Sequence, residues 1–468
     1  MKKLRCFYFS NILLFSPVLL FAQGVTDTTT AVVTLRQSIQ FAIGNQPVLK
    51  QAYIDEQINE RDIRIGLSAW LPQVSSSNSF QHYFQRPAVI AGGTTTGGTG
   101  TGTGSGTGTG GTGTGTGTTG QQNLAIAHNV SNIGVQASQV LYNNDVLLAS
   151  RGSKYSRQYY KQNTQSSKID LVSDVSKAFY DVLLSQRQLD IIKGDIIRLR
   201  RSLKDATSRY EAGVVDKTDY KQATIALNNA LASLKQTQEA IKSKTAYLKQ
   251  VMGFDPNKGL VLSYDSARFQ SDAVMDTTQM VSYGNRIEYQ LLETQKNIQN
   301  LNVSYYRWGF LPSLSAVGAY SLAYFNDSFS KLYNDAYPTS YAGLSLTIPI
   351  FTGTRRLQNL SKARLQVKRT DLDLENTRNA INTEYTQALA SYKSNYTNWQ
   401  LLSENVQLAR DVYKVVDLQY REGIKTYLDV IVSQTDLRTA ELNYYNALFQ
   451  LLSSKIDLQR ALGTLPTE

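Results

Sequence analysis

Two long stretches of the chain repeat apolar or aromatic side chains at alternating steps of four and three residues. This 3.5-residue spacing is typical of a coiled coil, in which one face of a helix packs along another helix. It predicts long helices at about 145–209 and 355–420, each roughly 100 Å long at 1.5 Å per residue. Shorter return helices are predicted at about 216–253 and 426–462. The repeated positions of the second stretch are Ile381, Tyr385, Ala388, Tyr392, Asn395, Trp399, Leu402, Val406, Ala409, Tyr413, Val416 and Tyr420.

Between the helical stretches, apolar residues alternate with small or polar ones with a period of two. The pattern is clear at 341–350 and 313–324, is broken at Gln139 and Val140 within 132–140, and is weak at 74–84. One apolar face over about ten residues is typical of a strand in a transmembrane β-barrel. Four strands cannot close a barrel, and lipid does not tolerate open strand edges. The chain is therefore predicted to oligomerise, and three copies would supply twelve strands.

The chain also repeats itself. YEAGVVDKTDY at 210–220 corresponds to YREGIKTYLDV at 420–430, whereas WLPQVSSSNSF at 70–80 corresponds to FLPSLSAVGAY at 310–320. The first pair is offset by 210 residues and the second by 240, so the first copy is longer by 30 residues. This surplus is close to the length of the Gly/Thr tract at 92–120. Such a tract cannot bury apolar surface, so it is predicted to be a disordered loop inserted between the first two strands.

The N-terminus has the features of a secretory signal peptide. Basic residues up to Arg5 precede an apolar stretch that is too short to span a membrane and is broken by Pro17, and Ala22 offers a small residue for cleavage. The repeat and this leader divide the chain. We expect a signal peptide at 1–22, an N-terminal segment and helix at 23–70, a strand pair at 71–142 with its disordered loop at about 86–122, two helices at 143–253, a linking segment at 254–284, a helix at 285–310, a second strand pair at 311–351, two helices at 352–463 and a tail at 464–468.

Composition and charge narrow the function. The formal net charge is +11, but an exported chain is a poor candidate for binding nucleic acid. Cys6 is the only cysteine and lies in the signal peptide, so no disulfide or thiol site is expected in the mature chain. The two histidines, His82 and His128, flank the Gly/Thr tract, and no acid–base or metal-binding role is expected for them. The sequence contains no catalytic triad, phosphate-binding loop or cluster of metal ligands. We therefore predict no enzyme, no cofactor and no metal.

Two Tyr-x-x-Gly turns join the long helices to the return helices. Gly213 and Gly423 can adopt the left-handed conformation that ends a helix. Asp216-x-x-Asp219 and Thr426-x-x-Asp429 are then spaced to cap the helices that follow, and capping alone would explain the paired acids. If the turns surround a pore, however, each carboxylate would also form a ring that favours cations, and ion pairs between neighbouring helices could hold the entrance closed.

Together these features resemble the TolC-like outer-membrane efflux protein family, also called outer-membrane factors. The resemblance rests on LRQSIQFAIGNQPVLKQA at 35–52, on paired Leu-Pro turns at 71–72 and 311–312, on LTIPIFTGTRR at 346–356, and on the two Tyr-x-x-Gly turns. It implies a mainly α protein with membrane β-structure. The expected assembly is a homotrimer whose twelve-strand outer-membrane β-barrel continues into a twelve-helix periplasmic α-barrel, with two structural repeats per chain.

The resemblance also implies a function and a site. The chain would be the outer-membrane exit channel of a tripartite efflux system, docked to a periplasmic adaptor (membrane fusion) protein and an inner-membrane transporter of the multidrug RND or ABC type, with lipid around its barrel. Lys425 stands where some members carry arginine, and Val432 where some carry a second acid, so we expect a loosely held entrance. The entrance residues would be Thr218, Asp219, Tyr420, Lys425 and Asp429, and the adaptor-docking turns would contain Tyr210, Gly213 and Gly423.

Two other functions are open at this point. A type I protein secretion channel would use the same duct. A soluble periplasmic coiled-coil scaffold or adaptor belongs to another class, and it would need one helical hairpin flanked by compact β-domains. The sequence instead alternates two hairpins with two amphipathic strand pairs.

Overall fold

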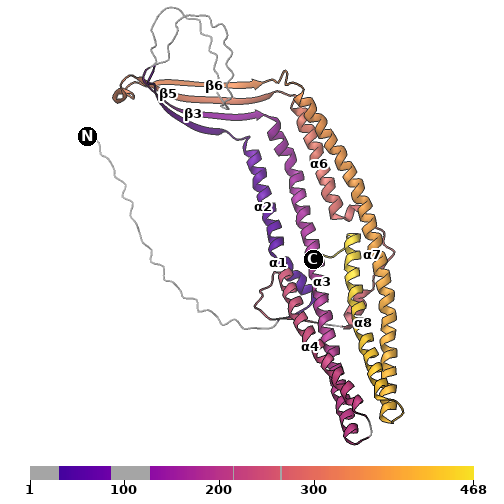
Figure 1. Cartoon of the computed structure of the whole chain (residues 1–468). Coiled ribbons are helices and arrows are strands. Elements are labelled where there is room, and N and C mark those ends of the chain that lie inside the picture. The colour runs from indigo at the N-terminus through magenta and orange to yellow at the C-terminus, as the bar shows by residue number, and fades with distance from the viewer. Residues whose placement is uncertain (1–30, 86–126, 214–215, 264–265, 468) are drawn as a thin grey trace, which may run out of the picture.

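The computed structural model describes residues 31–85, 127–213, 216–263 and 266–467. The predicted signal peptide and the Gly/Thr tract lie outside these residues. Figure 1 shows the strands at one end and two long helix pairs, α3 with α4 and α7 with α8, that run to tips at the opposite end. The main elements are α1 (Leu35–Asn45), α2 (Pro47–Ser68), β2 (Gln73–His82), β3 (Asn129–Tyr142), α3 (Asn144–Glu211), α4 (Lys217–Met252), α6 (Ile287–Trp308), β5 (Ser313–Asn326), β6 (Tyr337–Thr347), α7 (Arg355–Arg421) and α8 (Tyr427–Leu462).

The four long strands form one antiparallel sheet in the order β2-β3-β5-β6. The register shifts between Val140 and Tyr142, where the alternating pattern of the sequence also breaks, because a bulged residue changes the face of those that follow. β6 starts at Tyr337 and ends at Thr347, so the expectation that it continues to Ile350 is wrong. Pro349 has no backbone N–H for a ladder bond, which explains the earlier end.

The long helices pack along the predicted seam. On α7, all twelve positions of the repeat from Ile381 to Tyr420 are buried or half-buried. The largest apolar cluster lies where α3, α4 and α8 meet, and it includes Phe179, Leu183, Leu248 and Leu448. The 3.5-residue spacing therefore identified the packed face correctly.

None of the helices in the described ranges is both long and apolar enough to cross a membrane.

A small equatorial structure surrounds the middle of the helices. β1 (Ala31–Val33) pairs in parallel with β4 (Leu260–Leu262), and α5 (Ser266–Ala273) follows. The sequence did not indicate this sheet, because three residues are too few to show a period. β4 and α5 fall within the 254–284 segment, and the pairing with β1 joins the beginning of the described chain to this link between the two copies.

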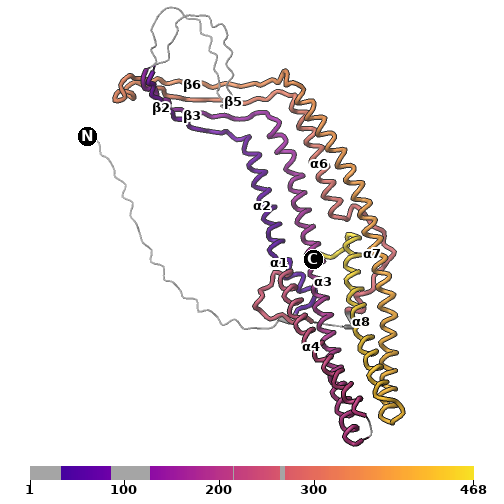
Figure 2. The backbone as a smooth tube through the Cα atoms, in the orientation of Figure 1, coloured from indigo at the N-terminus to yellow at the C-terminus, as the bar shows by residue number. Residues whose placement is uncertain are grey.

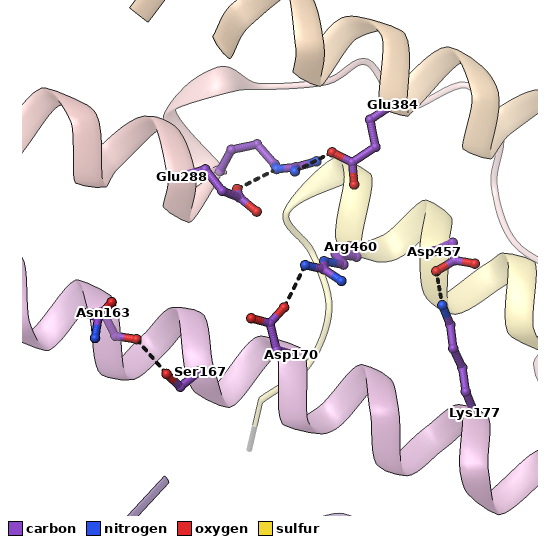
Figure 3. Close-up of polar contacts among 9 residues, drawn as sticks. Asn163, Ser167, Asp170, Lys177, Glu288, Glu384, Asp457 and Arg460 are labelled. Atoms are coloured by element: carbon purple, nitrogen blue, oxygen red, sulfur yellow. Dashed lines mark hydrogen bonds and ion pairs between the residues drawn. The ribbon is translucent and has the colours of Figure 1, made fainter. Parts of the chain in front are cut away.

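Ion pairs at the equator hold the upper end of α8. Arg286, which precedes α6, is 3% exposed. Its Nη1 donates to the carbonyl oxygen of Ala461 at 2.9 Å, and its other nitrogens pair with Glu288 at 3.1 Å and Glu384 at 2.7 Å. We call this group the equatorial clamp. It connects α8 to the start of α6 and to α7 (Figure 3).

Two further ion pairs fasten the same end of α8 to α3. Arg460 lies 2.6 Å from Asp170, and Asp457 lies 2.5 Å from Lys177 (Figure 3). The end of α8 is thus attached to three other helices, whereas its beginning lies at the distant tip.

Candidate functional site at the helical tips

The tips of both hairpins are built from a left-handed glycine followed by a helix cap. Figure 2 shows the two turns at the same end of the molecule, opposite the sheet. Gly213 has φ 70° and Gly423 has φ 78°, as predicted, and a side chain at either glycine would meet no atom within 4 Å. These glycines are therefore required by backbone conformation and not by crowding.

The turn into α8 contains the predicted cap. The Asp429 carboxylate accepts from the Thr426 backbone N–H at 3.0 Å and from the Thr426 hydroxyl at 2.8 Å, while that hydroxyl accepts from the Asp429 N–H at 3.3 Å. These hydrogen bonds, together with the weaker attraction of Lys425, lower the pKa of Asp429 below its usual value. Lys425 Nζ lies 4.0 Å from Asp429 Oδ1. The acid is charged, and its main partners belong to its own cap.

The turn into α4 is capped differently. Asp216, not Asp219, accepts from the Lys217 N–H at 2.5 Å, and the Thr218 hydroxyl donates to Asp216 at 3.4 Å. Asp219 is half-buried within the first turn of α4. It is therefore available for interactions beyond its own cap.

Tyr420 forms the contact between the two hairpins at the tip. It is 7% exposed and packs with Ala206, Ala223 and Val430. Its ring centroid lies 5.9 Å from that of Tyr427. Among the described residues, the hydroxyl groups of both tyrosines are buried without a hydrogen-bond partner. A partner at these hydroxyls must come from elsewhere, since buried polar groups are normally satisfied.

Charged groups surround Tyr420. The Arg209 guanidinium lies 4.5 Å from its ring centroid, a cation–π contact. Burial raises the pKa of Tyr420; Arg209 opposes this shift, and Asp219 adds to it. The negative charge of Asp219 therefore acts on the Tyr420 hydroxyl and contributes to its raised pKa.

The structure brings together some of the predicted entrance residues but not all of them. Tyr420 and Asp219 lie near each other across the two hairpins, and Lys425 lies near Asp429. Within the described part of one chain, no hydrogen bond or ion pair connects Thr218 or Asp219 to the Lys425–Asp429 pair. Within one chain these residues therefore form two groups that are not connected to each other.

Sequence reasoning missed the groove beside these residues. A cavity of about 390 Å³ lies between α3 and α7 and is lined by four arginines and two aspartates. Arg201 and Arg209 line it without an ion pair among the described residues, whereas Arg421 pairs with Asp417. The lining charges are Arg198, Arg201, Asp205, Arg209, Asp417 and Arg421.

A buried charge network above the groove was also missed. Asp195 of α3 is 2% exposed and accepts from Gln434 of α8 at 2.7 Å, with Arg198 and Arg438 each at 3.4 Å. Asp195 lies between Ile192 and Leu199 on the apolar face of α3, and a charge at such a position was the available signal.

The chain matches the outer membrane efflux protein family over residues 38–254 and 291–464. It is 22% identical over 337 residues to the outer membrane protein TolC of Vibrio cholerae, covering 71% of this chain and 76% of that protein. It is 24% identical over 309 residues to the toluene efflux pump outer membrane protein TtgC of Pseudomonas putida, covering 65% of this chain and 62% of that one.

Solved structures share the fold. The Campylobacter jejuni CmeC outer membrane channel gives a TM-score of 0.70 at 17% identity, covering 93% of this chain and 86% of that chain. The outer membrane protein VceC from Vibrio cholerae gives 0.69 at 14% identity, covering 92% and 96%.

Proposed function

The chain belongs to the outer membrane efflux protein family, and we propose that it works as the passive exit duct of a tripartite pump. It is an outer-membrane efflux channel with a periplasmic extension, not an enzyme. The question is how the geometry of this particular chain makes a duct, an entrance and a docking site.

The duct is supported above all by the open sheet. β2 and β6 are its edges, and each has one side without a neighbouring strand. Every residue of β6 is exposed, and Leu344 is 71% exposed although it is apolar. We infer that β6 of one copy pairs with β2 of the next in a homotrimer, so that twelve strands close in the outer membrane and the helices close into a tunnel below.

The entrance follows from the two groups at the tip. A neighbouring chain would bring its own tip beside the exposed Lys425–Asp429 pair, and contacts between chains would then join what one chain leaves separate. Lys425 offers a single point of charge, in contrast to the two-pronged guanidinium of arginine. We propose that Thr218, Asp219, Tyr420, Lys425 and Asp429 form a weakly latched entrance that favours cations.

The docking site is proposed from its position. The turns with Tyr210, Gly213 and Gly423 lie at the end of the molecule opposite the sheet. In the proposed trimer they would face the inner membrane. We propose that a periplasmic adaptor binds there and that an inner-membrane transporter supplies the energy. The relative TtgC is named as the outer membrane protein of a toluene efflux pump, and this supports a pump as the partner of the present chain.

The latch is tested by conductance in planar lipid bilayers. We expect the double variant Asp429→Ala with Lys425→Ala to raise single-channel conductance and to lower sensitivity to blocking cations, because a ring of acids and its ion pairs are removed. The matched control is Lys235→Ala with Glu239→Ala, which removes an exposed 2.6 Å pair in the middle of α4 and should leave conductance unchanged.

Two results would contradict the proposals separately. Unchanged conductance and cation block in the tip variant would contradict the latch but not the duct. If the processed wild-type protein forms no channel and remains a monomer without detergent, the duct itself is contradicted.

A further inference from the structure

The two histidines of the chain meet at the end of the sheet that lies away from the helices (Figure 1). His82 ends β2 and His128 precedes β3. Their ring centroids are 6.2 Å apart, with 25° between the ring planes. The sequence predicts no metal role for either ring, because only two histidines are present and both flank the Gly/Thr tract.

Each ring is held by a hydrogen bond at Nδ1. His82 Nδ1 lies 2.7 Å from the side-chain oxygen of Asn129. Asn129 is buried, and its amide nitrogen donates to the carbonyl oxygens of Asn326 at 3.2 Å and Asp327 at 3.1 Å, so its oxygen is the atom that faces His82. An oxygen acceptor at this position requires the proton on Nδ1 of the neutral ring.

The second ring has the same tautomer for the same reason. His128 Nδ1 lies 2.8 Å from the backbone carbonyl oxygen of Tyr83, which can only accept. Both rings therefore leave Nε2 with a free lone pair. A histidine that donates Nδ1–H to a carbonyl oxygen and offers Nε2 is the usual arrangement of a metal-bound imidazole.

The spacing of the rings fits one shared metal ion. With a metal–nitrogen bond of about 2.1 Å, the ring centroid lies about 3.2 Å from the ion, so two rings on opposite sides of one ion are up to about 6.4 Å apart, whereas two rings at a tetrahedral angle are about 5.2 Å apart. The observed 6.2 Å therefore fits opposite positions on a tetragonal ion and not a tetrahedral one. His82 is exposed and His128 half-buried, so neither is a core residue and an ion can reach the pair.

The local charge also suits a cation. The carboxylate of Asp327 accepts from the backbone N–H of His128 at 3.1 Å, which places a negative group beside the pair. The described residues contain no cluster of three or more His, Cys, Asp or Glu side chains suited to a metal, so the protein would supply two nitrogens here and water the remaining ligands.

We propose that His82 and His128 bind one Cu²⁺ or Ni²⁺ ion through their Nε2 atoms. Imidazole ligands and tetragonal geometry suit both ions, and Cu²⁺ binds more tightly in the usual order of divalent affinities. The ion fastens the end of β2 to the start of β3, at the two bases of the inserted tract. The site is independent of the entrance at the opposite end.

The test uses the mature full-length protein in detergent, purified without a histidine tag and titrated with Cu²⁺. We expect one Cu²⁺ per chain by calorimetry and an electron paramagnetic resonance spectrum with splitting from two nitrogens. His82→Ala and His128→Ala should each reduce the splitting to one nitrogen and weaken Cu²⁺ binding at least about tenfold. Removing the hydrogen-bond partner of a metal-bound histidine already lowers metal affinity by about tenfold, so removing the histidine itself should cost no less. Tyr83→Phe keeps the backbone carbonyl and should bind as the wild type does.

Several results would overturn the site. These are fewer than one Cu²⁺ per chain, a one-nitrogen spectrum in the wild type, or unchanged affinity when both histidines are replaced. If a variant fails to assemble, the wild type alone decides the matter. Cu²⁺ should protect both imidazoles from modification by diethyl pyrocarbonate, and modification of both at the unprotected rate would refute the proposal.

Discussion

At the residue scale, the most informative side chain is Arg286, because the repeat provides its own comparison. Gln46 occupies the corresponding place in the first copy, 240 residues earlier, and precedes α2 as Arg286 precedes α6. The Gln46 amide donates to the carbonyl oxygens of Gln250 at 3.3 Å and Val251 at 2.9 Å. Val251 corresponds to Ala461 at offset 210. Both copies therefore cap the end of a return helix in the same way, and the second adds two carboxylates.

This comparison gives a matched pair of variants. We expect Arg286→Met to lower the free energy of unfolding by about 2–3 kcal/mol, near the lower limit for a broken buried ion pair, because Glu288 and Glu384 are partly exposed and water can solvate them. Gln46→Met should cost about 1 kcal/mol, since only neutral hydrogen bonds are lost. Thermal melting of the purified protein measures both, and an equal loss in the two variants would refute the role of charge.

Local residue contacts could be predicted from the sequence, and distant ones could not. The Thr426–Asp429 cap was readable because its partners are three positions apart. Of the pair Asp216 and Asp219, which was expected to cap α4, only the Asp216 side chain does so. Arg209 over Tyr420, and Asp195 with Gln434, connect helices more than 200 residues apart. No spacing rule specifies which residues of two long helices meet, so these contacts required the structure.

At the element scale, periodicity predicted the long helices closely. The expected ranges 145–209 and 355–420 correspond to Asn144–Glu211 and Arg355–Arg421. An apolar repeat that continues over many turns identifies a helix well, and glycine and capping residues mark the ends of the helix. The three-residue strands β1 and β4 have neither a period nor a signal, so they were missed.

The glycines that end α7 and α8 allow a prediction at this scale. Both are left-handed, at φ 78° for Gly423 and 71° for Gly463. Gly423→Ala should cost about 1–2 kcal/mol from backbone strain alone, since its surroundings are open. Gly463→Ala should cost about 1–3 kcal/mol more, because its new Cβ would lie 2.8 Å from the Asn285 carbonyl oxygen. Chemical denaturation compares the two, and equal losses would contradict the close packing at the equator.

At the scale of the whole molecule, one chain leaves its sheet open. The sheet has two unpaired edges, Leu344 and Leu346 of β6 are exposed, and the predicted entrance residues fall into two groups. Family membership places it in the outer membrane, which is inconsistent with the alternative of a soluble periplasmic scaffold. The sequence predicted the open edges, because four strands cannot close a barrel. It could not predict how the two helical tips lie relative to each other.

The two faces of β6 supply the test. Leu344 and Ser345 are neighbours and point to opposite faces of the sheet. We expect Leu344→Arg to reduce assembly in the outer membrane, because a charge facing lipid near the midplane costs about 2–4 kcal/mol per chain. Ser345→Arg should be tolerated, as it would face the water-filled interior. The trimer content of the outer-membrane fraction on unheated gels measures the difference. If Ser345→Arg reduced assembly more than Leu344→Arg, the lipid-facing and interior faces of β6 would be the opposite of those proposed.

The equatorial clamp anchors one end of α8, whereas the other end packs at the tip through Tyr427 and Val430. The 36 residues of α8 extend for about 54 Å from the anchored end to Thr426. A rotation of only about 5° at the anchor would move the tip end through about 5 Å, about the height of one helical turn. A slight rearrangement at the waist would thus become a displacement large enough to break the packing of Tyr427 and Val430 against Tyr420.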